Sequence, residues 1–291
     1  MDPLDFTGRT VVVTGGTRGI GAAIAAAFHA AGADVLTCGR TPPHPLPPAG
    51  SPPAGLTVAS LPPDPSASSA LVPESALSAL EFFQADVRDP DQATALVKTA
   101  VDRFGRVDVV INNAGGSPEV PAGDASPRLH AKIIELNLIA PLHVAQAANA
   151  VMRDQETGGV ILMIGSVSGT RPSPGTAAYG AAKAGLHHLA TSLAAEWAPK
   201  VRVNTLVVGP VEASAPPVPD GTGSGGRAAS TVARTVPMGR AARAGEVAGA
   251  CLLLASPLAG YISGASLAVH GGGEWPAYLA DLRDTAYRAG K

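Results

Sequence analysis

Residues 9–21 read RTVVVTGGTRGIG and decide how the chain begins to fold. The β-branched run Arg9–Val13 is typical of a short strand, and the glycines that follow it predict a tight turn. The alanine-rich segment Ala22–Ala31 then predicts a helix. A strand, a glycine turn and a helix in this order predict an α/β protein with a parallel sheet.

The glycine turn leaves free backbone N–H groups at the start of a helix, where an anion binds well. Glycines also let the backbone approach a pyrophosphate closely. A P-loop would need Gly-Lys-Ser/Thr at this place, and the chain lacks it. We therefore expect the turn to bind a dinucleotide, through Gly15, Thr17, Arg18, Gly19, Ile20 and Gly21.

A second stretch, from Ser166 to Lys183, carries the candidate chemistry. The apolar run Val160–Ile164 predicts a buried parallel strand that brings Ser166 to its carboxyl end, where open α/β sheets bind ligands. Tyr179 and Lys183 are four residues apart in a helical sequence, so their side chains share one face. A phenol has a pKa of about 10, and an ammonium about 4 Å away stabilises tyrosinate by roughly 4 kcal/mol. Lys183 can therefore bring Tyr179 toward proton exchange near neutral pH.

A serine thirteen residues before Tyr-x-x-x-Lys, at a strand end, resembles the active site of the short-chain dehydrogenase/reductase family. Other marks of that family follow in its order: the glycine turn, Asp86-Val87, Asn112-Asn113-Ala114-Gly115, and Asn137 before a helix proline. The resemblance implies one Rossmann-type domain over residues 1–291, a doubly wound parallel sheet with helices on both faces.

The resemblance also implies roles for individual residues. Tyr179 is the expected general acid in reduction and base in oxidation, and Lys183 lowers its pKa and binds the nicotinamide ribose. Ser166 is expected to hydrogen-bond the substrate carbonyl, and Asn137 to hold a water that links the lysine to solvent. Further cofactor contacts are expected at strand ends, from Asp86, Val87, Asn113, Ala114, Gly115, Gly209 and Val211, with Tyr179 and Lys183.

The end of the second predicted strand, Asp34–Cys38, bears on which dinucleotide binds. A carboxylate there would accept the ribose 2′-OH of NAD and repel the 2′-phosphate of NADP. The chain has Gly39 and Arg40 instead, and Arg18 in the glycine turn adds a second cation. This pattern resembles family members that prefer NADP(H), so we expect NADP(H) and disfavour NAD.

Residues 211–240, rich in Gly, Ser and Pro toward their centre, lie where family members carry a substrate lid and are expected to form a mobile substrate loop. Elsewhere the chain departs from the family pattern. Residues 41–78 form a proline-rich insertion between the second and third strands, which we expect to be irregular. Val208 and Ala213 stand where the family has a proline and a threonine, which removes the hydroxyl of one expected cofactor contact.

Two long helices are expected to form an interface between subunits. One is predicted over Arg128–Met152, and Pro141 should kink it just beyond Asn137. The other is predicted over Tyr179–Trp197. By resemblance, this pair implies a homotetramer or a homodimer.

Composition excludes several classes of function. The net charge of −2 offers no basic excess for nucleic acid, and no apolar run approaches membrane-spanning length. The start of the chain lacks the pattern of a signal peptide, and Cys38 and Cys251 lack disulfide or metal spacing, which predicts a cytoplasmic protein. The histidines also lack ligand spacing, so we expect no metal site.

The predicted function is reduction of a ketone or other carbonyl by NADP(H), or oxidation of the matching secondary alcohol, by hydride transfer. A 3-oxoacyl thioester and a polyketide-like or steroid-like ketone are compatible substrates. One alternative is an NAD-dependent alcohol dehydrogenase, and another is an enoyl-thioester reductase, although related enoyl reductases space tyrosine and lysine more widely. A third, from another class, is a catalytically silent NADP-binding regulator or scaffold.

Overall fold

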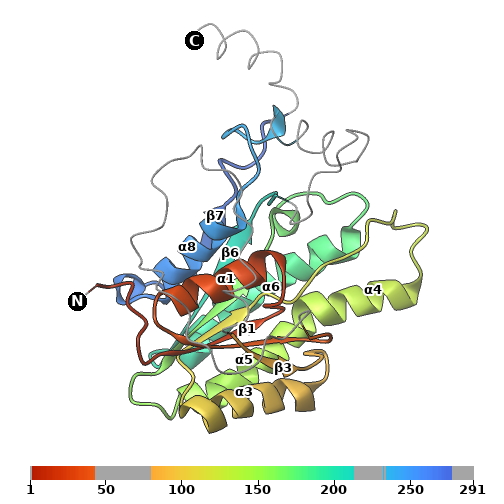
Figure 1. Cartoon of the computed structure of the whole chain (residues 1–291). Helices are drawn as coiled ribbons and strands as arrows, with labels where there is room; N and C mark the ends of the chain where they lie inside the picture. Colours follow the sequence, from red (N-terminus) through yellow and green to blue (C-terminus); the bar gives the residue numbers. More distant parts are fainter. Residues whose placement is uncertain (1, 43–79, 213–231, 233, 277–291) are drawn as a thin grey trace, which may run out of the picture.

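A computed structural model describes residues 2–42, 80–212, 232 and 234–276 (Figure 1). Within them the strands form one parallel sheet in the order β3-β2-β1-β4-β5-β6-β7. The strands are β1 (Thr10–Thr14), β2 (Asp34–Gly39), β3 (Glu81–Gln84), β4 (Val109–Asn112), β5 (Gly159–Ile164), β6 (Val201–Val208) and β7 (Ser266–Val269).

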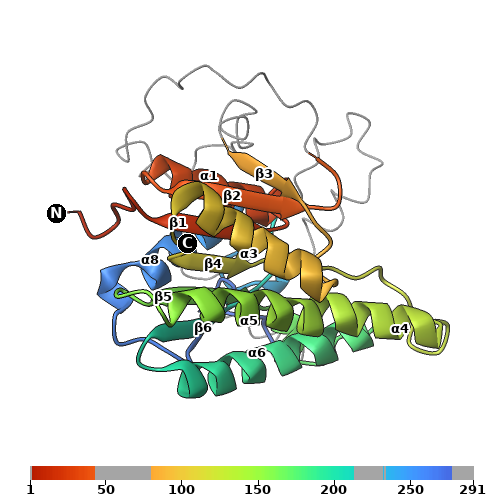
Figure 2. The same cartoon turned by 90° about the horizontal axis from the view of Figure 1, so that it is seen from below.

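Helices cover both faces of this sheet. They are α1 (Gly19–Ala30), α3 (Pro90–Phe104), α4 (Pro127–Ile134), α5 (Ala140–Met152), α6 (Ala177–Trp197) and α8 (Ala244–Ala255). Helices α1 and α8 pack together on one face, and α3, α5 and α6 lie side by side on the other (Figure 2). The predicted doubly wound Rossmann-type fold is confirmed.

The strands are apolar on both faces because helices cover both. Val11 and Val13 of β1 belong to the core that includes α1 and α8, whereas Val12 between them belongs to the core of α3, α5 and α6. Successive side chains of a strand point to opposite faces, so one β-branched run serves two cores. None of the helices in the described part of the chain is long and apolar enough to cross a bilayer.

Helix α3 begins at Pro90, directly after Asp89. The carboxylate of Asp89 accepts hydrogen bonds from the backbone N–H groups of Asp91 and Gln92, and Pro90 occupies the first turn, where no N–H donor is needed. Gly105 ends the helix with a φ of +82°, a left-handed conformation that favours glycine.

The helix predicted over Arg128–Met152 contains a π-helical turn, η2 (Glu135–Ile139), between α4 and α5. The N–H of Ala140 donates to the carbonyl of Glu135, five residues back. Pro141 follows and has no N–H to restore the four-residue pattern at that position. The kink expected beyond Asn137 is therefore a wider turn that contains Asn137 itself.

Most of the insertion at residues 41–78 and of the loop at residues 211–240 lies outside the described residues. The expectations of irregular structure and of a mobile substrate loop therefore stay predictions. The same is true of the boundaries of the single domain.

We expect Leu162→Ala to lower the free energy of unfolding by about 2–5 kcal/mol, because it leaves a cavity in the fully buried centre of β5. Urea unfolding at constant slope measures this loss. Leu253→Ala on α8, where the side chain is 45% exposed, is the matched control and should cost less than about 1 kcal/mol. Equal losses for both variants would contradict the described packing.

Candidate active site

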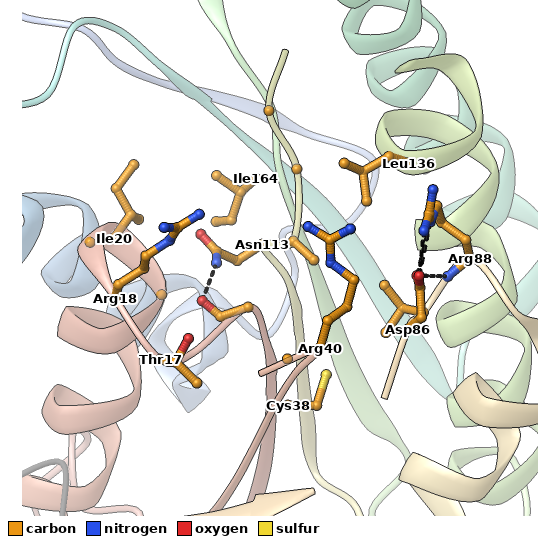
Figure 3. Close-up of a pocket in the computed structure, with 18 of the residues that line it drawn as sticks. Thr17, Arg18, Ile20, Cys38, Arg40, Asp86, Arg88, Asn113, Leu136 and Ile164 are labelled. Carbon is orange, nitrogen blue, oxygen red and sulfur yellow. Dashed lines mark hydrogen bonds and ion pairs between the residues drawn. The ribbon is translucent and has the colours of Figure 1, made fainter. Parts of the chain in front are cut away.

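A cavity of about 890 Å³ opens at the carboxyl ends of the strands (Figure 3). It lies where the strand order reverses, since β1 pairs with β2 on one side and with β4 on the other. Most residues predicted for the site line it: Gly15, Thr17, Arg18, Gly19, Ile20, Gly21, Gly39, Arg40, Asp86, Val87, Asn113, Ala114, Gly115, Ser166, Tyr179, Lys183 and Gly209.

Asn137 and Val211 lie outside the lining of this cavity. Val211 forms an isolated bridge with Ala242 and packs against the core of α1 and α8. Its expected contact with the cofactor stays a prediction.

Several lining residues were missed from the sequence: Cys38, Thr41, Pro42, Ala85, Arg88, Gly116, Leu136, Ile164, Gly165 and Val208. Most of them adjoin a residue that the motifs singled out, so extending each motif by a residue or two would have found them. Leu136, for example, directly precedes Asn137.

The glycine turn is packed tightly against β4. Gly15 has a φ of +65°, and a Cβ on Gly21 would lie 2.3 Å from the carbonyl oxygen of Gly15. The amide of Asn113 donates to the carbonyls of Thr14 and Gly15 at 2.9 and 3.2 Å. Position 21 requires glycine, because any side chain there would collide with the carbonyl of Gly15. The two hydrogen bonds from Asn113 hold the turn at the start of α1.

Thr14, which was not among the residues predicted for the site, joins the ends of β1 and β4. Its buried hydroxyl accepts hydrogen bonds from the N–H groups of Asn113 and Ala114, both at 3.0 Å, and donates to the carbonyl of Ile111 at 3.3 Å. The Asn-Asn-Ala-Gly segment is thereby fixed beside the glycine turn. The position of Thr14 directly before the glycine turn was the signal in the sequence that could have identified it as a site residue.

Arg18 and Arg40 extend toward the same part of the cavity (Figure 3). The amide of Gln84, at the end of β3, donates to the carbonyl of Arg40 at 2.9 Å and supports that backbone. Within the described residues, neither guanidinium forms an ion pair with a carboxylate. The two arginines offer charged donors to an anionic group in the cavity.

Asp86 is engaged by a neighbouring side chain. Nε of Arg88 donates to Oδ1 of Asp86 at 2.9 Å, and a second guanidinium nitrogen binds Oδ2 (Figure 3). The hydrogen bond from Arg88 is the main reason that the pKa of Asp86 is lowered, and the charge of Arg40 contributes. The expected contact of Asp86 with the cofactor stays a prediction.

The catalytic candidates meet at the other end of the cavity. Ser166 precedes the short helix η3 (Val167–Gly169), where its Oγ accepts the N–H of Ser168 at 3.2 Å, and its side chain hydrogen-bonds to Tyr179. Nζ of Lys183 lies 5.6 Å from the centre of the Tyr179 ring and donates to the carbonyl of Ile164 at 2.7 Å. Strand β5 and helix α6 thus bring together the three side chains.

Burial dominates the ionisation of this cluster. It raises the pKa of Tyr179, and the hydrogen bond from Ser166 opposes that change. Burial also lowers the pKa of Lys183 to about 8. The lowering of the tyrosine pKa by Lys183 stays a prediction.

Asn137 lies fully buried behind the cavity wall. Its Oδ1 accepts the N–H of Gly116, and its Nδ2 donates to the carbonyls of Gly116 and Ile133, all at 2.9 Å. A Cβ on Gly115 would lie 2.7 Å from Oδ1 of Asn137 and 3.5 Å from Nζ of Lys183. Asn137 therefore clamps the segment after β4 close to the lysine, and its expected role in holding a water stays a prediction.

Two family models match the chain. Residues 54–274, more than half of it, match the model described as enoyl-(acyl carrier protein) reductase. Residues 9–46 match the model described as short chain dehydrogenase.

Relatives of several activities are similar over nearly the whole chain. 3beta-Hydroxysteroid dehydrogenase 1 of Eggerthella lenta is 32% identical, covering 92% of this chain and 94% of the relative. The peroxisomal 2,4-dienoyl-CoA reductase of Pongo abelii is 31% identical over 96% of this chain and 87% of the relative.

A solved structure, a double mutant of a Serratia marcescens short-chain dehydrogenase/reductase, has a TM-score of 0.74 with 27% identity. The match covers 92% of this chain and 98% of that structure. The chain belongs to the short-chain dehydrogenase/reductase family of oxidoreductases, which bind nicotinamide cofactors.

Proposed function

We propose that the protein reduces a ketone with NADPH, or oxidises the matching secondary alcohol with NADP. The observation that carries this proposal is the convergence of Ser166, Tyr179 and Lys183 in one cavity with the glycine turn. When bound, the nicotinamide ring supplies or accepts a hydride at the carbonyl carbon.

The residues of the cavity fit such a cofactor. The glycine turn and the first N–H groups of α1 suit the pyrophosphate, and Arg18 and Arg40 suit the 2′-phosphate of NADP. Gly115 also contributes to this fit, because a side chain at this position would collide with Asn137 and approach Lys183. The ammonium of Lys183 is available to the nicotinamide ribose at that position.

Proton transfer is the task of this chain's own side chains. Ser166 hydrogen-bonds the carbonyl oxygen of the substrate as negative charge develops there, and Tyr179 gives its proton to that oxygen during reduction. In the opposite direction Tyr179 accepts the proton from the alcohol. Lys183 favours tyrosinate by its charge. Asn137 positions the segment Gly115–Gly116 beside the lysine.

Relatives guide the choice of substrate. Similarity to 3beta- and 3alpha-hydroxysteroid dehydrogenases supports a steroid-like or other polycyclic ketone as the substrate. The relatives named as dienoyl-CoA reductases make an acyl thioester the second substrate class to test. We further propose a cytoplasmic homodimer or homotetramer built on α5 and α6, by analogy with the family.

We expect Tyr179→Phe to lower kcat by at least about 100-fold in ketone reduction, because the variant loses the proton donor. The dissociation constant for NADPH, followed by nicotinamide fluorescence, should change little. A catalytically silent NADPH-binding protein would instead give no turnover in the wild type with ketones or acyl thioesters, and Tyr179→Phe would then change nothing.

We expect Arg40→Asp to weaken NADPH binding by about 10- to 100-fold and to leave NADH binding nearly unchanged, because it replaces a donor for the 2′-phosphate with a repelling charge. Fluorescence titration with both cofactors measures the change.

Arg153→Asp, the same charge change at an exposed position outside the cavity, is the control. A wild type that prefers NADH would reject the assignment of Arg18 and Arg40 and would favour an NAD-dependent alcohol dehydrogenase.

A further inference from the structure

His187 stands four residues beyond Lys183 on α6 and contacts the segment that carries Ser166. The backbone N–H of Ser166 donates to Nε2 of His187 at 3.3 Å. An imidazole that accepts at Nε2 is neutral and carries its proton on Nδ1. The imidazole of His187 therefore binds the main chain of the catalytic serine. His187 itself lies on α6, the helix that also carries Tyr179 and Lys183.

Two glycines make room for the imidazole. A Cβ on Gly165 would lie 2.4 Å from Nε2 of His187, and a Cβ on Gly169 would lie 2.8 Å from Cε1. These glycines flank Ser166 in sequence, so the segment between them bends around the ring. Side chains at either position would displace His187 and the serine together.

The surroundings of His187 favour its neutral form. Burial and the charge of Lys183 both lower its pKa below the ordinary value. Strand β5 and helix η3, which pack beside α6, carry no ionisable side chain, and β6 carries Arg202, which donates to the carbonyls of Leu254 and Ile262. Other ionisable groups on α6, or on the α4 and η2 segments packed against it, are Arg128, His130, Lys132, Glu135, Tyr179, His188 and Glu196.

We propose that His187 is a positioning residue, which holds the N–H of Ser166 and thereby directs the serine hydroxyl toward Tyr179. This inference rests on the proposed function. Protonation of His187 removes the acceptor and adds a second cation near Lys183. Catalysis by Ser166 is then lost as His187 becomes charged.

The hydrogen bond is tested first without turnover. In NMR spectra of the ¹⁵N-labelled full chain, the amide resonance of Ser166 should titrate together with the His187 ring as the pH is lowered. His188→Gln, at the adjacent exposed position, should leave this titration in place, and His187→Gln should remove it. A Ser166 amide that stays constant while the His187 ring titrates would overturn the proposal.

The catalytic consequence is tested in ketone reduction with NADPH. His187→Leu should lower kcat about 5- to 10-fold and change KM for NADPH less than about twofold, because one hydrogen bond to Ser166 is lost. In His187→Gln the amide oxygen replaces Nε2 as acceptor, so kcat should return to within about twofold of the wild type. Equal kcat values for His187→Leu and His188→Gln would reject the positioning role.

The pH profile separates positioning from a purely structural effect. Tyr179 stays protonated as the pH falls, so it does not limit reduction in acid. The wild type should lose kcat as the pH falls through the lowered pKa of His187, and His187→Gln should keep it. Identical acid limbs in the two proteins would reject the proposal. A wild type without turnover on any ketone would refute the proposed function itself, and the Ser166 amide titration would still decide the contact.

Discussion

The hydrogen bonds between the ends of β1 and β4 are the constraint on which the rest of the site depends. Thr14 accepts two backbone N–H groups from the segment after β4, and Asn113 returns two bonds to the glycine turn. All of these groups are at least partly buried, so each would cost free energy if left unpaired. The crevice at the reversal of strand order is thus fixed in width before any ligand enters it.

Helix α6 orders the reactive end of the crevice. Tyr179, Lys183 and His187 follow one another at intervals of four residues, and each contacts β5 or the Ser166 segment that follows it. One packed helix face therefore sets the positions of a phenol, an ammonium and an imidazole relative to Ser166. Gly165 and Gly169, opposite this face, and Gly180 on α6 itself allow the close approach, since at each of them a Cβ would meet neighbouring atoms within 3 Å.

Charge is distributed unevenly along the cavity. Arg18 and Arg40 lie at one end without a carboxylate partner in the described part of the chain, and Lys183 is buried at the other end with a pKa of about 8. Asp86 follows the edge strand β3, and its charge is compensated by Arg88. The lining thus offers cations at both ends, which suits a ligand whose anionic groups and hydroxyls are spread along its length.

The fold and most of the site could be predicted from the sequence because they depend on local pattern. Apolar runs, the glycine turn and the four-residue spacing of Tyr179 and Lys183 are set by backbone geometry over a few residues. The π-helical turn around Asn137 was not predicted, since it depends on how individual N–H groups find their acceptors. Only the tertiary structure decided that Arg88 engages Asp86, that Asn137 clamps Gly116 and that His187 accepts from Ser166. The last two contacts join residues about twenty positions apart, and even the short-range pair depends on side-chain directions that packing sets.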